Sequence, residues 1–373
     1  MASYVGVHTR AGTVTRVASS RPRGAVRASS APGTEVAAEV SAYGVAMPTD
    51  RVEPTVSDST VEKNKSAYQT VAKGGDLGGW ERVMVDVPET PGLVPVQEMH
   101  LWGPRLSQRY VGQLLLPFFA KKTRCFRVTD SVWMLEQSFL GPLPPPGPPD
   151  FVLRTTVVRL ATGGLWVVSP VAPTEECLAL LAAIGGPVEH IVAPNTSPEH
   201  TTFVEEWATR HFPAAQVWAV AQLKGKLGSA EARAMWLSGD TAAGAEAAWG
   251  GEIRAVVTAF DPPAGSPVKF AEATFLVKEP RAVLTFDLAF GYWPDRYAEG
   301  SLTEMFWGAF GVASALTPTH LSSKPLFDQD PAMARAWLAA VGGMDFDVLI
   351  SGHGSAPIAG ARGLIQRGYG HLA

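Results

Sequence analysis

The stretch GLWVVSPVAPTEECLALLAAIGG, residues 164–186, decides the fold class, because it joins a buried strand to a capped helix. Its first part, Leu165–Val171, is rich in Val and Trp, which favour strands. Its second part, Thr174–Ile184, indicates a helix with Thr174 as N-cap, acidic residues in the first turn and a Gly-Gly stop. Val188–Ala193 is again a short apolar strand. This order of elements predicts an α/β layered domain.

The pattern continues on both sides of this stretch. The further strands that we expect are Val128–Phe139, Phe151–Leu160, Gln216–Val220, Glu252–Phe260, Val268–Val277, Arg281–Phe286 and Phe346–Ile350. The further helices are Thr202–His211, Ser301–Leu316 and Pro331–Val341. Thr202 and Glu205 have capping-box spacing. Residues 223–249 show little periodicity and predict no element.

Composition excludes several classes of protein. The chain has 373 residues, of which 46% are hydrophobic and 18% charged, so it can bury a sizeable core. Two cysteines, Cys125 and Cys177, cannot build a disulfide framework, and we expect Cys177 to be a buried thiol on the apolar side of its helix. No apolar run reaches the roughly 18 residues of a membrane span.

The charge is divided unevenly along the chain. Residues 1–34 hold five arginines and no acid, while the whole chain has a net charge of −4, which leaves −9 on the remainder. That balance argues against a nucleic-acid partner, since phosphate contacts need clustered Lys and Arg. The composition of residues 1–34 is typical of an organelle transit peptide, chloroplast or mitochondrial, which import machinery recognises. The alternative is a disordered tail with a chance bias.

A linker and an extension separate this leader from the regular part. Residues 35–79 are poor in aromatic residues and indicate a disordered linker. Residues 80–149 indicate an N-terminal extension, with a helix expected over Arg105–Phe119. The run GPLPPPGPP, residues 141–149, is typical of polyproline II and indicates a stiff connection, with a ligand for an SH3- or WW-like partner as the alternative. Residues 150–373 then form the α/β domain.

Three polar residues follow predicted strands. His200 comes after Val188–Ala193, Asp287 directly after Arg281–Phe286, and His353 after Phe346–Ile350. Ligands of α/β sheets gather beyond the carboxyl ends of strands. Two imidazoles and a carboxylate suit zinc, iron or manganese. A structural histidine and a capping aspartate are the alternative reading of these residues, and Glu199 and His190 are weaker additions to the set.

Other catalytic patterns are absent from the sequence. It contains no G-x-S-x-G elbow, no phosphate-binding P-loop, no G-x-G-x-x-G opening a helix and no H-E-x-x-H. His200, Asp287 and His353 therefore remain as the candidate site, beside the structural reading of each residue.

Several segments together resemble a known family. These are residues 164–176, Gly186–Asn195, Glu199-His200, Thr285–Leu288 and Ser351-Gly-His-Gly354. In order and spacing they resemble the metallo-β-lactamase-like proteins, specifically an uncharacterised domain-of-unknown-function family, number 4336, of plants, algae and bacteria. The resemblance covers residues from about 125 to about 370. It implies a four-layer αββα sandwich, in which two mixed sheets pack between outer helices.

The resemblance also implies a reduced metal site. The H-x-H-x-D-H motif of active relatives falls on Asn195-Thr-Ser197-Pro-Glu199-His200, where only His200 matches and Glu199 replaces the aspartate. The bridging aspartate falls on Asp287 and the last histidine on His353. The histidine expected before Asp287 is missing, and Glu272 is the nearest polar residue there. What remains implies one ion on His200, Asp287 and His353, with Glu199 as general base.

Two functions follow from this reading. The first is a mononuclear metal-dependent hydrolase of an organelle that acts on an ester, a thioester or a phosphoester of an unidentified small molecule. The second is a metal-free scaffold of the same fold that binds a metabolite or a protein partner. A third, weaker reading is an interaction protein that acts through the proline run.

Overall fold

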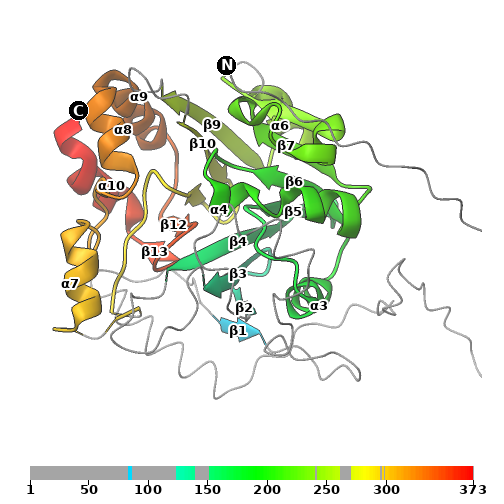
Figure 1. The fold of residues 1–373 in the computed structure, drawn as a ribbon, viewed down its shortest axis with the longest axis horizontal. Coiled ribbons are helices and arrows are strands. Elements are labelled where there is room, and N and C mark those ends of the chain that lie inside the picture. The colour runs from blue at the N-terminus through cyan, green and yellow to red at the C-terminus, as the bar shows by residue number, and fades with distance from the viewer. Residues whose placement is uncertain are drawn as a thin grey trace, which may run out of the picture. The chain divides into compact units, whose positions relative to one another are not determined.

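Two β-sheets pack face to face and carry helices on their outer faces (Figure 1). The computed structural model describes residues 83–85, 123–138, 151–239, 242–260, 270–294, 296–297 and 299–372. All of these lie in one compact unit, Asp50–Ala373. The predicted leader, most of the linker and extension, the Arg105–Phe119 helix and the proline run lie outside the described residues. The αββα sandwich expected from the resemblance is confirmed.

The first sheet has eight strands in sequence order. They are β1 (Val83–Val85), β2 (Thr123–Arg127), β3 (Val132–Ser138), β4 (Val152–Arg159), β5 (Leu165–Val168), β6 (Val188–Ala193), β7 (Gln216–Val220) and β8 (Ala234–Leu237). Neighbours from β1 to β5 pair antiparallel, and those from β5 to β8 pair parallel. Three strands of the expected N-terminal extension, β1, β2 and β3, therefore belong to the same sheet as β4.

The second sheet has five strands in the order β13-β12-β11-β10-β9. They are β9 (Ile253–Phe260), β10 (Phe270–Val277), β11 (Ala282–Thr285), β12 (Val348–Ser351) and β13 (Ile358–Ala359). Only β11 and β12 pair parallel. Their carboxyl ends therefore meet at one edge of the sheet, where the chain continues to Asp287 and His353.

Side chains of the second sheet alternate between two cores, as the period of a strand requires. Leu284 and Ile350 join the core between the sheets. Their neighbours Val283 and Leu349 face the opposite way, into a core shared with the outer helices. These helices are α8 (Ser323–Gln329), α9 (Pro331–Gly342) and α10 (Ala361–Tyr369). Asp330 caps α9, because its side chain accepts a hydrogen bond of 3.0 Å from the amide of Met333.

The helices of the first sheet follow its parallel strands. They are α3 (Glu175–Ile184), α4 (Pro198–Thr201), α5 (Val204–Glu206) and a π-helical turn at Trp207–His211. Thr174 caps α3 as predicted. The prediction that the next helix begins at Thr202 is wrong: Ser197 is the N-cap of α4 with Pro198 at the first position, and the Thr202 hydroxyl donates back to the Pro198 carbonyl.

Three other segments differ from the prediction. The strand expected over Val128–Phe139 begins only at Val132, because a tight turn joins it to β2 and the amide of Val128 donates to the carbonyl of Val132. Residues 223–249 contain short 3₁₀ turns, β8 and α6 (Ala242–Ala248), which are too short to show a period. The helix expected over Ser301–Leu316 is shorter than predicted: α7 spans Leu302–Ala309, and Gly311 follows it in a left-handed conformation with φ of 79°. Among the helices of the described residues, none is long and apolar enough to cross a membrane.

Candidate metal centre

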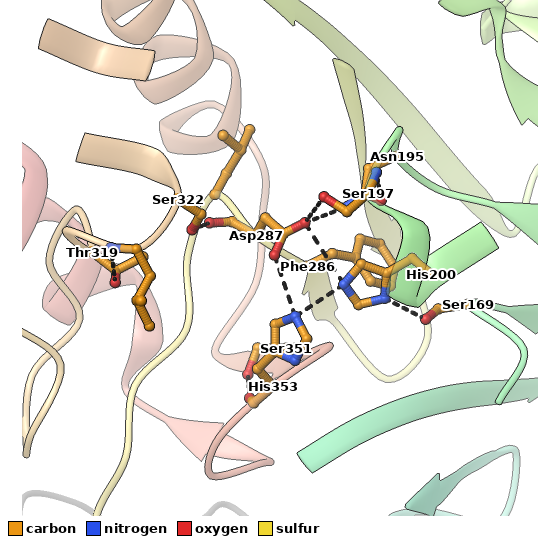
Figure 2. Close-up of polar contacts among 12 residues, drawn as sticks. Ser169, Asn195, Ser197, His200, Phe286, Asp287, Thr319, Ser322, Ser351 and His353 are labelled. Atoms are coloured by element: carbon orange, nitrogen blue, oxygen red, sulfur yellow. Dashed lines mark hydrogen bonds and ion pairs between the residues drawn. The ribbon is translucent and has the colours of Figure 1, made fainter. Parts of the chain in front are cut away.

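His200, Asp287 and His353 lie together between the two sheets, and Figure 2 shows their side chains pointing toward one another. His200 is in α4 beyond the end of β6, whereas Asp287 and His353 each stand two residues past the ends of β11 and β12. Their exposed fractions are 0%, 4% and 0%. The carboxyl ends of strands from both sheets thus supply one buried site, as the positions in the sequence predict.

The distances between the ligand atoms are short. The two Nε2 atoms of His200 and His353 lie 3.0 Å apart. Oδ1 of Asp287 is 3.3 Å from Nε2 of His353, and its Oδ2 is 3.8 Å from Nε2 of His200. One metal ion can bind ligand atoms with these spacings at about 2.0–2.2 Å from each, which is the bond length of zinc to nitrogen or oxygen ligands.

The second ring nitrogen of each histidine, Nδ1, lies within hydrogen-bond distance of a residue that fixes the orientation of the ring. Nδ1 of His353 lies 2.9 Å from the carbonyl oxygen of Val152, which can only accept, so this nitrogen carries the hydrogen and Nε2 of the neutral ring is bare. Nδ1 of His200 lies 2.7 Å from Oγ of Ser169. Gly352 leaves room for His200, since a Cβ atom there would lie 2.8 Å from Cε1 of the ring.

Two neutral donors bind Oδ2 of Asp287, the oxygen nearer to His200. Nδ2 of Asn195 donates to Oδ2 at 2.7 Å, and the Ser197 hydroxyl donates to the same oxygen at 2.6 Å. These are the two positions where the resemblance places histidines in active relatives. The structure therefore puts hydrogen-bond donors where a second ion would need ligands, while Oδ1 of Asp287 faces His353.

Glu272 supports the Asp287 loop. Its carboxylate lies in β10 and accepts the amides of Phe286 at 3.0 Å and Asp287 at 2.7 Å. Longer hydrogen bonds of 3.3 Å come from the Leu288 amide and the Asn195 side chain. The residue is fully buried and lies outside the group of side chains that can share an ion.

Glu199 belongs to that group. Its carboxylate and the ligand atoms of His200, Asp287 and His353 all lie within 4.8 Å of one another. Glu199 is half-buried, whereas the other three are buried. Burial, and then the charge of Asp287, raises the pKa of Glu199 to about 7. This geometry allows Glu199 to serve either as a base or as a fourth ligand.

Burial and mutual charge shift the other pKa values in opposite directions. Burial lowers the pKa of His200 to about 3, so its ring is neutral. For His353, burial is outweighed by the hydrogen bond to Asp287 and its charge, which raise its pKa. For Asp287, burial is outweighed by the hydrogen bond and charge of His353 together with the charge of His200, so its pKa lies below the usual range.

Two further residues singled out in the sequence lie outside the site. His190, in β6, accepts a hydrogen bond of 3.1 Å at Nδ1 from Nε1 of Trp218. Cys177 is fully buried, as expected, and burial raises the pKa of its thiol. Sequence reasoning missed Ser169, because it lies inside the predicted strand Leu165–Val171, whereas β5 ends at Val168.

The solved structures that this chain resembles are distant from it in sequence and in structure. A fragment of a putative diflavin flavoprotein from Nostoc sp. is 11% identical to this chain, with a TM-score of 0.44. The match covers 68% of this chain and 95% of the fragment. A flavoprotein from Thermotoga maritima is 12% identical, with a TM-score of 0.43, and the match covers 68% of this chain and 60% of the flavoprotein. The mono-zinc form of the metallo-β-lactamase FIM-1 from Pseudomonas aeruginosa is 12% identical, with a TM-score of 0.39. The match covers 68% of this chain and 93% of FIM-1.

The curated proteins contain no match to this chain. A family model matches residues 129–291, which include β3 to β11 and three of the four residues at the centre. This model describes DUF4336, a domain of unknown function, and it matches less than half of the chain.

Proposed function

We propose that the chain is a mononuclear metal-dependent hydrolase in which His200, Asp287 and His353 hold the ion. One observation carries the proposal: the two Nε2 atoms face each other at 3.0 Å, while Nδ1 of His353 is turned to the Val152 carbonyl. Two nitrogen lone pairs at that distance repel, so a cation or a proton must lie between them. The nearby carboxylate of Asp287 adds the negative charge that a cation needs.

The residues present fit one ion of zinc, iron or manganese. Two imidazoles and a carboxylate form a common ligand set for these metals and leave positions open. A bound divalent ion supplies Lewis acidity to an ester, thioester or phosphoester group. Asn195 and Ser197 offer Asp287 hydrogen bonds in place of further ligands, which supports a single ion rather than a pair.

Glu199 is our candidate for the general base. It is the one half-buried member of the group, so water and substrate reach the centre on its side. A carboxylate with a pKa near 7 matches a base that takes a proton from an attacking water at neutral pH. The arginine-rich composition of residues 1–34 supports an organelle, the chloroplast or the mitochondrion, as the place of action.

A metal-free scaffold is the second candidate. The contact of 3.0 Å between the histidines also fits a shared proton, and the raised pKa of His353 beside Asp287 favours that proton. The two candidates differ in what the purified protein contains.

Metal content separates the candidates. We expect the full chain, expressed with added zinc, iron and manganese, to hold about one ion per chain by mass spectrometry. His200→Gln and His353→Gln should each lose it. His190→Gln is the matched control, because His190 pairs with Trp218 and should keep the ion. A metal-free wild-type chain, or retention by both variants, contradicts the proposal.

Activity is tested with generic substrates. Metal-loaded wild-type chain should cleave p-nitrophenyl acetate, a thioester or bis(p-nitrophenyl) phosphate. Glu199→Gln should keep the ion and lower turnover by about 10²- to 10⁴-fold, as expected for loss of a general base. If Glu199→Gln releases the ion, Glu199 is a fourth ligand. A loaded wild-type chain without turnover contradicts the hydrolase.

A further inference from the structure

We infer that Arg154 is a positioning residue for His353, fixing the loop that carries this histidine so that its imidazole faces His200 and Asp287. The inference rests on the proposed metal site, and it names a residue that touches neither the ion nor the substrate.

The guanidinium group of Arg154 reaches the backbone of the His353 loop. Its Nη1 donates to the carbonyl oxygen of Ser351 and, at 3.3 Å, to that of His353. Its Nη2 donates to the carbonyl oxygen of Gly354 at 2.6 Å. One side chain thus binds the loop on both sides of the histidine and at the histidine itself.

Glu136 fixes the orientation of that side chain. Its Oε1 accepts Nε of Arg154 at 3.1 Å and Nη2 at 2.7 Å. Both residues have an exposed fraction of 0%, and Arg296 binds the same carboxylate at 2.8 Å. A buried guanidinium needs such a partner, and the planar pair leaves its outer N–H groups aimed in one direction.

The strand that carries Arg154 also holds the ring of His353. Val152, two residues earlier on the same face of β4, accepts the Nδ1 hydrogen at 2.9 Å. Phe151, just before β4, packs against the imidazole with 4.4 Å between ring centroids. The first sheet therefore orients a ligand that the second sheet supplies. A ligand held this way is pre-organised, and loosening its support weakens metal binding.

The experiment compares Arg154→Lys with Arg159→Lys. Lys keeps the charge but cannot bind three carbonyls and Glu136 at once. Arg159 is at the other end of β4, where it donates to the Ile184 carbonyl, far along the strand from Val152. We expect Arg154→Lys to weaken zinc binding, measured by competition with a chelator, by about 10- to 100-fold, and Arg159→Lys to leave it unchanged. Should Arg154→Lys fail to fold, Glu136→Gln, which loosens the same guanidinium, takes its place.

A second readout uses the metal-free protein and separates this inference from the proposed function. At a pH where the His353 ring is neutral, its ¹⁵N spectrum should show hydrogen on Nδ1 in the wild type and in Arg159→Lys, and a mixture of tautomers in Arg154→Lys. If the wild type binds no zinc, the proposed function fails, and the ring spectrum alone decides on Arg154. An unchanged spectrum, or zinc affinity within about twofold of the Arg159→Lys value, overturns the positioning role.

Discussion

Ser169 holds the ring of His200 with its side-chain oxygen 2.7 Å from Nδ1, and it does so from a left-handed backbone conformation with φ of 56°. A non-glycine residue in this region costs of order 1 kcal/mol and persists only where its surroundings fix it. The hydroxyl of Thr155 supplies one such restraint, donating to the Ser169 carbonyl at 2.8 Å. Strand β4 therefore supports both histidines, His200 through Thr155 and Ser169, and His353 through Val152.

Removing the Ser169 hydroxyl should weaken metal binding. We expect Ser169→Ala to lower zinc affinity by about 10-fold, because the ring of His200 loses the contact that orients it. Ser314→Ala is the matched control: Ser314 also has positive φ, 49°, but its hydroxyl lies 2.7 Å from the Tyr297 hydroxyl. Isothermal titration with zinc measures both. Equal affinities of the two variants would show that Ser169 does not orient His200.

A bound ion should stabilise the fold. His200 follows a strand of the first sheet, whereas Asp287 and His353 follow strands of the second, so an ion joins the two sheets. An ion present at 100 times its Kd should raise the free energy of unfolding by about 2.7 kcal/mol. Urea titrations with zinc and with excess chelator measure the difference. The double variant His200→Gln/His353→Gln should show none, and an equal response there would mean that zinc binds elsewhere.

Much of the fold could be predicted because its signals are local. The stretch from Leu165 to Ala193 alternates apolar strand, capped helix and apolar strand, and the structure confirms all three. By contrast, β8 has four residues and a mixed burial pattern, so no period could mark it. The true N-cap of α4 was missed because Ser197 makes no side-chain capping bond, whereas Thr202 and Glu205 imitate a capping box.

The candidate site was partly predictable for a related reason. His200, Asp287 and His353 stand just beyond strands, and the topology brings strand ends together. Arg154 and Glu136 gave no such signal. Each is a single charge inside a strand, and the loop that Arg154 binds is about 200 residues further along the chain. Which carbonyls that guanidinium reaches depends on how the two sheets pack, and sequence spacing does not encode this.

We expect the stability of the fold to depend on the Glu272 carboxylate as a hydrogen-bond acceptor. Four N–H groups point at its buried carboxylate, from the backbone of residues 286–288 and from Asn195. In Glu272→Gln, the new NH₂ group must face at least one of these donors, which should cost about 1–3 kcal/mol of unfolding free energy.

Glu252→Gln is the control for this change. Glu252 also accepts a backbone amide, that of Ala161 at 2.9 Å, but at an exposed position where water can replace the bond. Its substitution should cost less than about 0.5 kcal/mol. Urea unfolding of both variants compares them, and similar losses would mean that the donors around Glu272 can turn away.

His190 should make stability depend on pH. Its Nδ1 accepts the Trp218 indole hydrogen, which requires a bare nitrogen, and burial lowers the pKa of His190, against the charge of Glu189. The unfolded chain keeps the ordinary pKa of about 6.5. As pH falls through that value, the unfolded chain binds a proton that folded His190 resists, so the folded state loses stability. In His190→Gln, the side chain at this position binds no proton in either the folded or the unfolded state. In urea unfolding at about pH 7.5 and about pH 5.5, the wild type should therefore lose more free energy than His190→Gln, and equal losses would show that the Trp218 contact does not hold His190 neutral.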